Sequence, residues 1–143
     1  MECDGERRTI TSMTIEITPE MRERAIKLLT PELEAITQRM RELAGEVAAE
    51  FDLPEPIASL WLTDLTRQGM SAVRDREAGL AELAGHRQLD LIAALGGGTQ
   101  PNYRKKCPNA KEFAETQRVA DRTRMTLPVT AGDWTFEVAS STS

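Results

Sequence analysis

Residues 26–47 read IKLLTPELEAITQRMRELAGEV, and large apolar side chains recur in this stretch at an unbroken spacing of three or four. On an α-helix this spacing places them along one stripe, the pattern by which one helix packs lengthwise on another. The sequence therefore predicts a mainly α fold, a helical bundle with long amphipathic helices. We call this stripe the seam; its members are Ile26, Leu29, Leu33, Ile36, Met40, Leu43 and Val47.

The residues before the seam carry the signals of a helix start. Thr18 offers an N-cap oxygen, Pro19 suits the first helical position, and Glu20 places negative charge near the positive end of the helix dipole. Pro31 repeats this chemistry inside the seam, in the sequence Thr-Pro-Glu. The repeat predicts either a second helix that begins at Pro31 or one helix that is kinked there.

Prolines at 54 and 56 end this first helical region, and a second helix is expected to start near Pro56. Gly69 followed by Ser71 indicates a break or kink in it. A further helical stretch carries Leu80 and Leu83 and extends toward Leu95, although Gly85 interrupts its pattern. Residues 13–95 are therefore expected to form a helical body.

Residues 96–102, GGGTQPN, are the clearest linker, because three consecutive glycines lose too much backbone entropy in a regular element. We expect them to form a hinge between the body and an appendage of residues 103–143. The appendage is predicted to contain a helix from about Pro108 to Met125. A β-hairpin should follow, joining 127–130 to 134–138 through a turn at Gly132 and Asp133.

The N-terminal end of the chain is expected to be simple. Residues 1–12 are predicted to be a disordered tail. Residues 13–17 alternate apolar and polar side chains, which is typical of a short strand, and this strand is expected to pair with residues 134–138.

The composition, with 40% hydrophobic and 29% charged residues, is that of a folded domain rather than a disordered chain. The start of the sequence lacks the basic and apolar segments of a signal peptide, and no apolar run approaches the roughly twenty residues of a membrane span. With two cysteines in 143 residues, a disulfide framework is not indicated. We therefore expect a cytoplasmic protein that does not enter a membrane.

Motifs for catalysis, metal binding or nucleotide binding are missing from the sequence. Glu42, Glu46 and Glu50 have the spacing of helical metal ligands, but the single histidine, His86, has no Glu-x-x-His context. Cys3, Cys107 and His86 are too scattered for a zinc site. The expectation is a protein that is not an enzyme and that uses no cofactor or metal.

Charge is unevenly distributed along the chain, whose net charge is −5. Residues 14–100 hold fifteen acidic and nine basic side chains, whereas residues 101–126 hold three acidic and seven basic ones. This basic segment predicts contacts either with an acidic protein surface or with phosphates, where Tyr103 would stack on an unpaired base. Its members are Tyr103, Arg104, Lys105, Lys106, Lys111, Arg118, Arg122 and Arg124.

Two arrangements of the seam are open. It is expected to pack on the chain's own later helices, and self-association is the alternative. The charges that flank it do not form the salt bridges of a parallel coiled coil, because Glu32 and Arg39 would face threonine and alanine. The functional hypothesis is a structural or interaction protein that self-associates through helix packing, as part of an assembly such as a virion. The alternative is a small nucleic-acid-associated regulator that uses residues 103–124.

Overall fold

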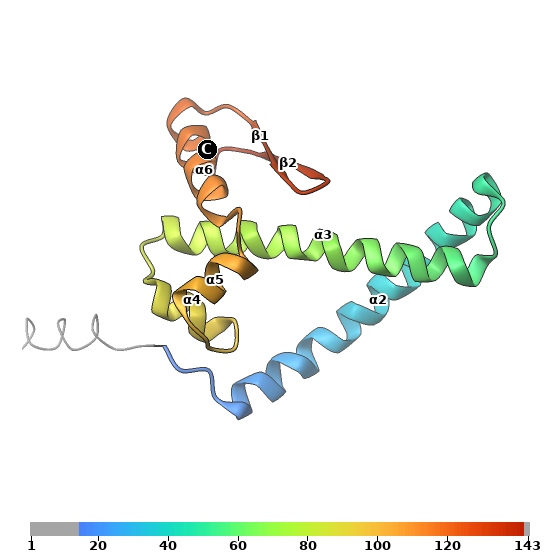
Figure 1. The fold of residues 1–143 in the computed structure, drawn as a ribbon, viewed down its shortest axis with the longest axis horizontal. Helices are drawn as coiled ribbons and strands as arrows, with labels where there is room; N and C mark the ends of the chain where they lie inside the picture. The colour runs from blue at the N-terminus through green and yellow to red at the C-terminus, as the bar shows by residue number, and fades with distance from the viewer. Residues whose placement is uncertain (1–14, 142–143) are drawn as a thin grey trace, which may run out of the picture.

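The computed structural model describes residues 15–141, and this part of the chain is mainly α (Figure 1). Two long helices, α2 (Pro19–Phe51) and α3 (Glu55–Leu83), are followed by three shorter ones. The shorter helices are α4 (Gln88–Ala94), α5 (Gln100–Lys106) and α6 (Ala110–Thr123). A hairpin of β1 (Leu127–Ala131) and β2 (Trp134–Val138) ends the described fold. The predicted mainly α class and the C-terminal hairpin are thus confirmed.

Helix α2 begins at the predicted cap residue and ends just before the prolines that were predicted to stop it. The Thr18 hydroxyl oxygen accepts a hydrogen bond of 3.1 Å from the backbone N–H of Met21. Asp52 ends the helix in the left-handed conformation, with φ of 54°. Pro31 lies inside one uninterrupted helix, so of the two predicted alternatives the structure has a single helix that passes through the proline.

Helix α3 runs without interruption past Gly69, and the predicted break there is wrong. A Cβ atom at position 69 would lie 3.2 Å from Cζ2 of Trp134. The glycine therefore provides room for the indole ring of β2 rather than a helix end. The helix stops at Leu83, and Gly85, with φ of 96°, separates it from α4.

The three glycines at 96–98 all have positive φ, between 91° and 117°, a conformation that glycine adopts without steric cost. Thr99 then caps α5, since its hydroxyl oxygen accepts from the backbone N–H of Asn102. Residues 100–102, which the sequence assigns to the linker, form the first turn of α5. The linker proper is therefore shorter than predicted.

The core of the protein lies around α3 rather than between α2 and α3. One cluster joins α3 to α6 and the hairpin, and Phe113 and Val129 are its largest fully buried side chains. Phe113 also stacks at a tilt on Phe136, with ring centroids 5.9 Å apart. The buried members of this cluster are Ala72, Phe113, Ala120, Val129, Ala131 and Val138.

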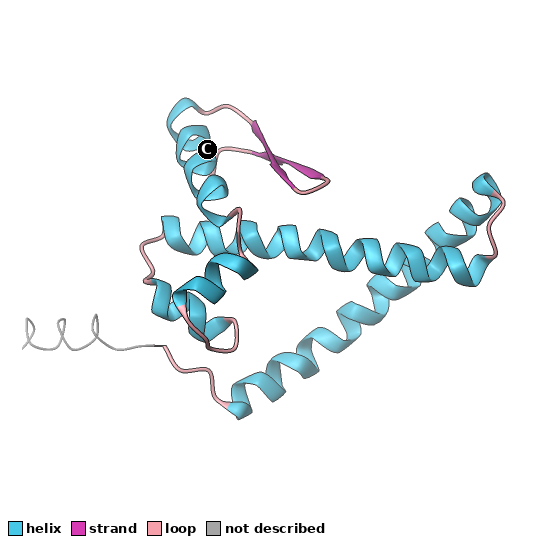
Figure 2. Ribbon diagram, in the orientation of Figure 1, coloured by secondary structure: helices cyan, strands magenta, loops and turns pink. Residues whose placement is uncertain are grey.

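A second cluster joins the C-terminal half of α3 to α4 and α5. Its buried members are Ala78, Leu91, Ile92, Tyr103, Cys107 and Ala110. Figure 2 shows the resulting arrangement, with α6 and the hairpin to one side of α3 and α4 and α5 to the other. Residues 103–141 are thus packed on α3 through both clusters.

The hairpin matches its prediction closely. β1 and β2 pair antiparallel with Ala131 opposite Trp134, so Gly132 and Asp133 form the connecting turn. Among the described residues, β2 has no other strand partner.

The predicted N-terminal strand is not present in the described residues 15–17, which have no regular secondary structure. The backbone N–H of Ile15 donates instead to the carboxylate of Asp90, at 3.1 Å. The earlier residues of that strand, 13 and 14, lie outside the described part of the chain, as does the predicted tail of residues 1–12.

Candidate protein–protein interface

The N-terminal half of the seam faces solvent. Its side chains Ile26, Leu29, Leu33 and Ile36 keep 45%, 55%, 59% and 44% of their surface exposed. Four large aliphatic side chains on one face of a helix form an apolar surface, and its exposure to water is unfavourable in free energy. Among residues 15–141, this half of the seam has no helix packed on it, in contrast to the expected packing on the later helices.

The reason lies in the geometry of the α2–α3 hairpin. Next to the connecting turn the two helices are in close contact, and Ala44 and Ala58 are almost completely buried. The Thr66 hydroxyl of α3 lies against the sulfur atom of Met40. From there the helices diverge, so α3 does not reach the N-terminal half of α2 (Figure 1).

Further apolar side chains are exposed at the tip of the hairpin. Phe51 is 61% exposed at the end of α2, and Ile57, Leu60 and Trp61 are 54%, 67% and 47% exposed at the start of α3. The spacing of three and four places the last three on one side of α3. Both arms of the hairpin therefore present apolar surface.

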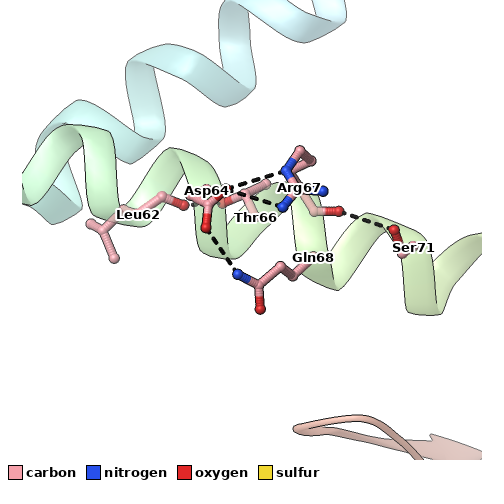
Figure 3. A network of polar contacts seen from close by, with 6 residues as sticks. All are labelled: Leu62, Asp64, Thr66, Arg67, Gln68 and Ser71. Atoms are coloured by element: carbon pink, nitrogen blue, oxygen red, sulfur yellow. Dashed lines mark hydrogen bonds and ion pairs between the residues drawn. The ribbon is translucent and has the colours of Figure 1, made fainter.

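The middle of α3 carries a polar network whose hydrogen bonds lie within the helix, apart from the contact of Thr66 with Met40 of α2. The carboxylate of Asp64 accepts from Arg67 at 3.2 Å and from Gln68 at 2.9 Å. Every contact drawn in Figure 3 joins residues of α3 to each other. The side chains of Asp64, Arg67 and Gln68 lie on the exposed surface of the helix, and they do not form a binding or catalytic site.

The basic segment does not form one surface patch of free cations. Tyr103 is 4% exposed, and its hydroxyl donates to the carboxylate of Glu82. Its ring is therefore closed to a stacking base, and the stacking role predicted for it does not fit its position. Lys106 donates to the carbonyl oxygen of Leu95 at 3.0 Å, and Arg118 pairs with Glu115. The remaining members, Arg104, Lys105, Lys111, Arg122 and Arg124, have exposed side chains.

Several polar side chains are buried where α3 meets α5 and the start of α6. Asp75 is 3% exposed, and its Oδ2 atom accepts from the Asn109 side chain at 3.0 Å. Burial raises the pKa of the neighbouring Cys107 thiol. A buried thiol with a raised pKa is a poor nucleophile, because the thiolate is the reactive form. Sequence reasoning missed this cluster, since Asp75 is 34 positions from Asn109 along the chain.

An open groove of about 1160 Å³ lies between the N-terminal segment and the end of α4. Its walls are mostly apolar, with Ile15, Ile17 and Met21 on one side and Ala93 and Leu95 on the other. It gathers no set of reactive groups. Sequence reasoning missed it because residues 15–17 were expected to lie in a sheet.

The carboxylates considered as metal ligands remain at the surface. Glu42, Glu46 and Glu50 are exposed on α2, and His86 is exposed after α3. Within residues 15–141, no three side chains of the metal-binding types come together. None of the described helices is both long and apolar enough to cross a membrane.

Comparison of the chain with protein families, with curated proteins and with solved structures finds no match. The interpretation of the molecule therefore rests on its own residues. Of the surfaces described above, the exposed half of the seam is the one that repeats regularly along a single helix.

Proposed function

We propose that this protein is a non-enzymatic structural or interaction protein that self-associates through the seam of α2. The setting that we propose for it is a larger assembly, such as a virion. The observation that carries the proposal is the exposure of Ile26, Leu29, Leu33 and Ile36 on one face of a helix that extends away from the core.

Energetics support this proposal. Complete burial of one such side chain contributes roughly 1.5–3 kcal/mol, and because each keeps about half of its surface exposed, covering it contributes about half of that. Four of them on each of two chains offer more than the about 4 kcal/mol at the lower end of the cost of association. A second helix with the same spacing is the natural cover, because helices with apolar stripes of this kind pack side by side.

Leu28 and Leu29 provide a matched test. They are adjacent, of the same type and similarly exposed, at 58% and 55%, but only Leu29 belongs to the seam. We expect Leu29→Lys to shift the solution mass, measured by light scattering after size exclusion, from oligomer toward monomer. Leu28→Lys should leave the mass of the wild-type oligomer unchanged.

A wild-type protein that is monomeric at every concentration would contradict the proposal. Equal effects of the two lysine variants would also contradict it, since the seam would then not be the contact surface. The alternative proposal, a nucleic-acid-associated regulator, would then gain support from the exposed Arg104 and Lys105.

A further inference from the structure

We propose that the partner of the seam is a second copy of α2 in antiparallel orientation, related by a two-fold axis that passes between residues 34 and 35. This inference rests on the proposed self-association and specifies its geometry. In this arrangement, seam residues of the two chains lie opposite each other where their numbers add up to 69, and the flanking residues pair where they add up to 71 on one side and 67 on the other.

Six of the seven apolar residues of the seam match each other in this register, and the seventh, Val47, lies at the end of the contact opposite Arg22. Antiparallel helices pack position a of the heptad against position d of the partner. With Ile26, Leu33 and Met40 at a and Leu29, Ile36 and Leu43 at d, each a residue meets a d residue. The three layers, each formed twice, are Ile26 with Leu43, Leu29 with Met40, and Leu33 with Ile36.

The flanking charges choose this register over its neighbours. Here Glu32 of one copy lies beside Arg39 of the other, and the two-fold axis forms this pair twice. If the partner helix is shifted by one heptad, so that opposite seam residues add up to 62, Glu32 lies against Glu32 of the other copy. A shift of one heptad in the other direction, to a sum of 76, places Arg39 against Arg39 and Glu32 against Glu46. Both neighbouring registers therefore bring like charges together.

Helix α3 leaves most of the required side of α2 open, although Thr66 of α3 contacts the layer residue Met40, which is half-buried. Helix α3 covers the flank that carries Ala44, which is 1% exposed. The opposite flank carries Glu32 and Arg39, and the Arg39 side chain is 65% exposed and bound only to Glu42 of its own helix, at 3.1 Å. The second copy can therefore approach on the charged flank while α3 stays in place.

The threonines on the α3 flank are also compatible with a helix neighbour. Thr30 of one copy would meet Thr37 of the other, and neither needs a new hydrogen bond. The Thr30 hydroxyl donates to the Ile26 carbonyl oxygen at 2.7 Å, and the Thr37 hydroxyl donates to the Leu33 carbonyl oxygen at 2.8 Å.

The net charge along α2 fits the same orientation. Residues 22–27 contain three basic side chains and one acidic one, and they would face residues 42–47, which contain two acidic side chains and no basic one. A parallel arrangement would place each of these segments against its own copy. Opposite charges at the two ends therefore favour the antiparallel dimer.

Charge reversal tests the paired residues. Glu32→Arg and Arg39→Glu should each weaken dimerisation, measured by sedimentation equilibrium, by about tenfold, because two attractive pairs become repulsive. The double variant should recover most of the wild-type affinity. Glu34 and Arg41 provide the control, since they have the same charges and the same seven-residue spacing but lie off the seam; reversing them singly or together should change little.

Spin labels measure the orientation directly. The background variant is Cys3→Ser with Cys107→Ala, and its mass and helicity must first equal those of the wild type. A spin label is then placed at residue 24 or at residue 38, both on the face of α2 opposite the seam. At about 1.5 Å per residue, the antiparallel register separates the two labels at 24 by about 30 Å along the axis and those at 38 by about 10 Å. A parallel dimer gives equal distances at both sites.

The outcomes separate the two proposals. A longer distance at 24 than at 38, together with recovery in the double variant, supports the antiparallel dimer. Equal distances or no recovery, in a protein that still self-associates, overturns the geometry and leaves the proposed function standing. A wild-type protein that stays monomeric overturns both.

Discussion

At the scale of single residues, Gly79 sets how closely α6 can approach α3. A Cβ atom there would meet the carbonyl oxygen of Ala110 and lie 2.9 Å from Cβ of Phe113. Alanine is a better helix former than glycine by about 1 kcal/mol, but the clash costs more. We expect Gly79→Ala to lower the free energy of unfolding by roughly 1–3 kcal/mol, measured by urea denaturation.

Gly45 is the control for this substitution, because it also lies inside a long helix. Its added Cβ would have only the Glu55 side chain nearby, at 3.8 Å. Gly45→Ala should therefore raise the free energy of unfolding by about 0.5–1 kcal/mol. If both variants gain stability, the close approach of α6 to Gly79 of α3 does not occur in solution.

Tyr103 gives a second prediction at this scale, since it is the only tyrosine of the chain. Burial, followed by the hydrogen bond to Glu82, raises the pKa of its phenol above the ordinary value near 10. The neutral phenol is favoured in the folded state, so its contribution to stability is present below about pH 10 and decreases as the pH rises further. Absorbance at 295 nm should show no phenolate at pH 11 until the protein unfolds.

Tyr103→Phe separates this effect from other groups that titrate at high pH. Between pH 8 and pH 11, the urea midpoint of the wild type should fall further than that of the variant, since only the wild type gains a phenolate on unfolding. Equal decreases would show that the phenol titrates alike in both states, and that its contact with Glu82 does not persist in solution.

At the scale of the elements, the tripeptide Thr-Pro-Glu occurs twice in different roles. At 18–20 it caps α2, whereas at 30–32 it lies inside the helix, where Thr30 bonds back to Ile26. Proline in a helix interior costs about 3 kcal/mol, because it removes one backbone hydrogen bond and its ring crowds the preceding turn. We expect Pro31→Ala to slow amide hydrogen exchange in residues 20–30 by at least about tenfold.

Pro19→Ala is the internal comparison for that measurement. The N–H of the first helical residue has no partner within the helix, so restoring it adds no hydrogen bond. Exchange in residues 20–30 should therefore stay the same or become faster. A gain as large as that of Pro31→Ala would mean that α2 does not start where Thr18 places it.

The elements also show where sequence reasoning works. Cap residues and turn glycines act locally, so the start of α2, its end at Asp52 and the turn at Gly132 could be predicted. Gly69 could not be interpreted in the same way, because its role depends on Trp134, which is distant in sequence. The strand predicted at 13–17 is not seen in its described residues 15–17 for a related reason: alternation describes one strand, but a strand also needs a partner edge.

At the scale of the whole molecule, the seam was evident from its spacing, but its exposure was not. Amphipathic periodicity shows that a face needs cover and does not say whether the cover comes from the same chain. That depends on the angle between α2 and α3, which are in contact near the connecting turn and diverge beyond it (Figure 1). The burial of Tyr103 likewise follows from the contact between α3 and α5, and charge patterning does not indicate it.

Salt dependence distinguishes the two ways in which whole molecules could associate. Contacts through the apolar seam should persist at about 1 M NaCl, where the Debye length is only about 3 Å, because burial of aliphatic surface does not depend on screening. Docking of the basic residues 104–106 on an acidic neighbour would dissociate under the same conditions. We expect the solution mass at protein concentrations well above the dissociation constant to be the same at low and high salt.

The variant Arg104→Ala, Lys105→Ala, Lys106→Ala completes this comparison. It removes three positive charges and leaves the seam intact, so its mass should equal that of the wild type at both salt concentrations. A wild-type oligomer that dissociates at high salt, together with a monomeric triple variant, would assign the association to the basic segment. Because α2 and the basic segment lie on different helices, the triple variant and the seam variant Leu29→Lys change separate surfaces, and together they identify which surface joins one copy to the next.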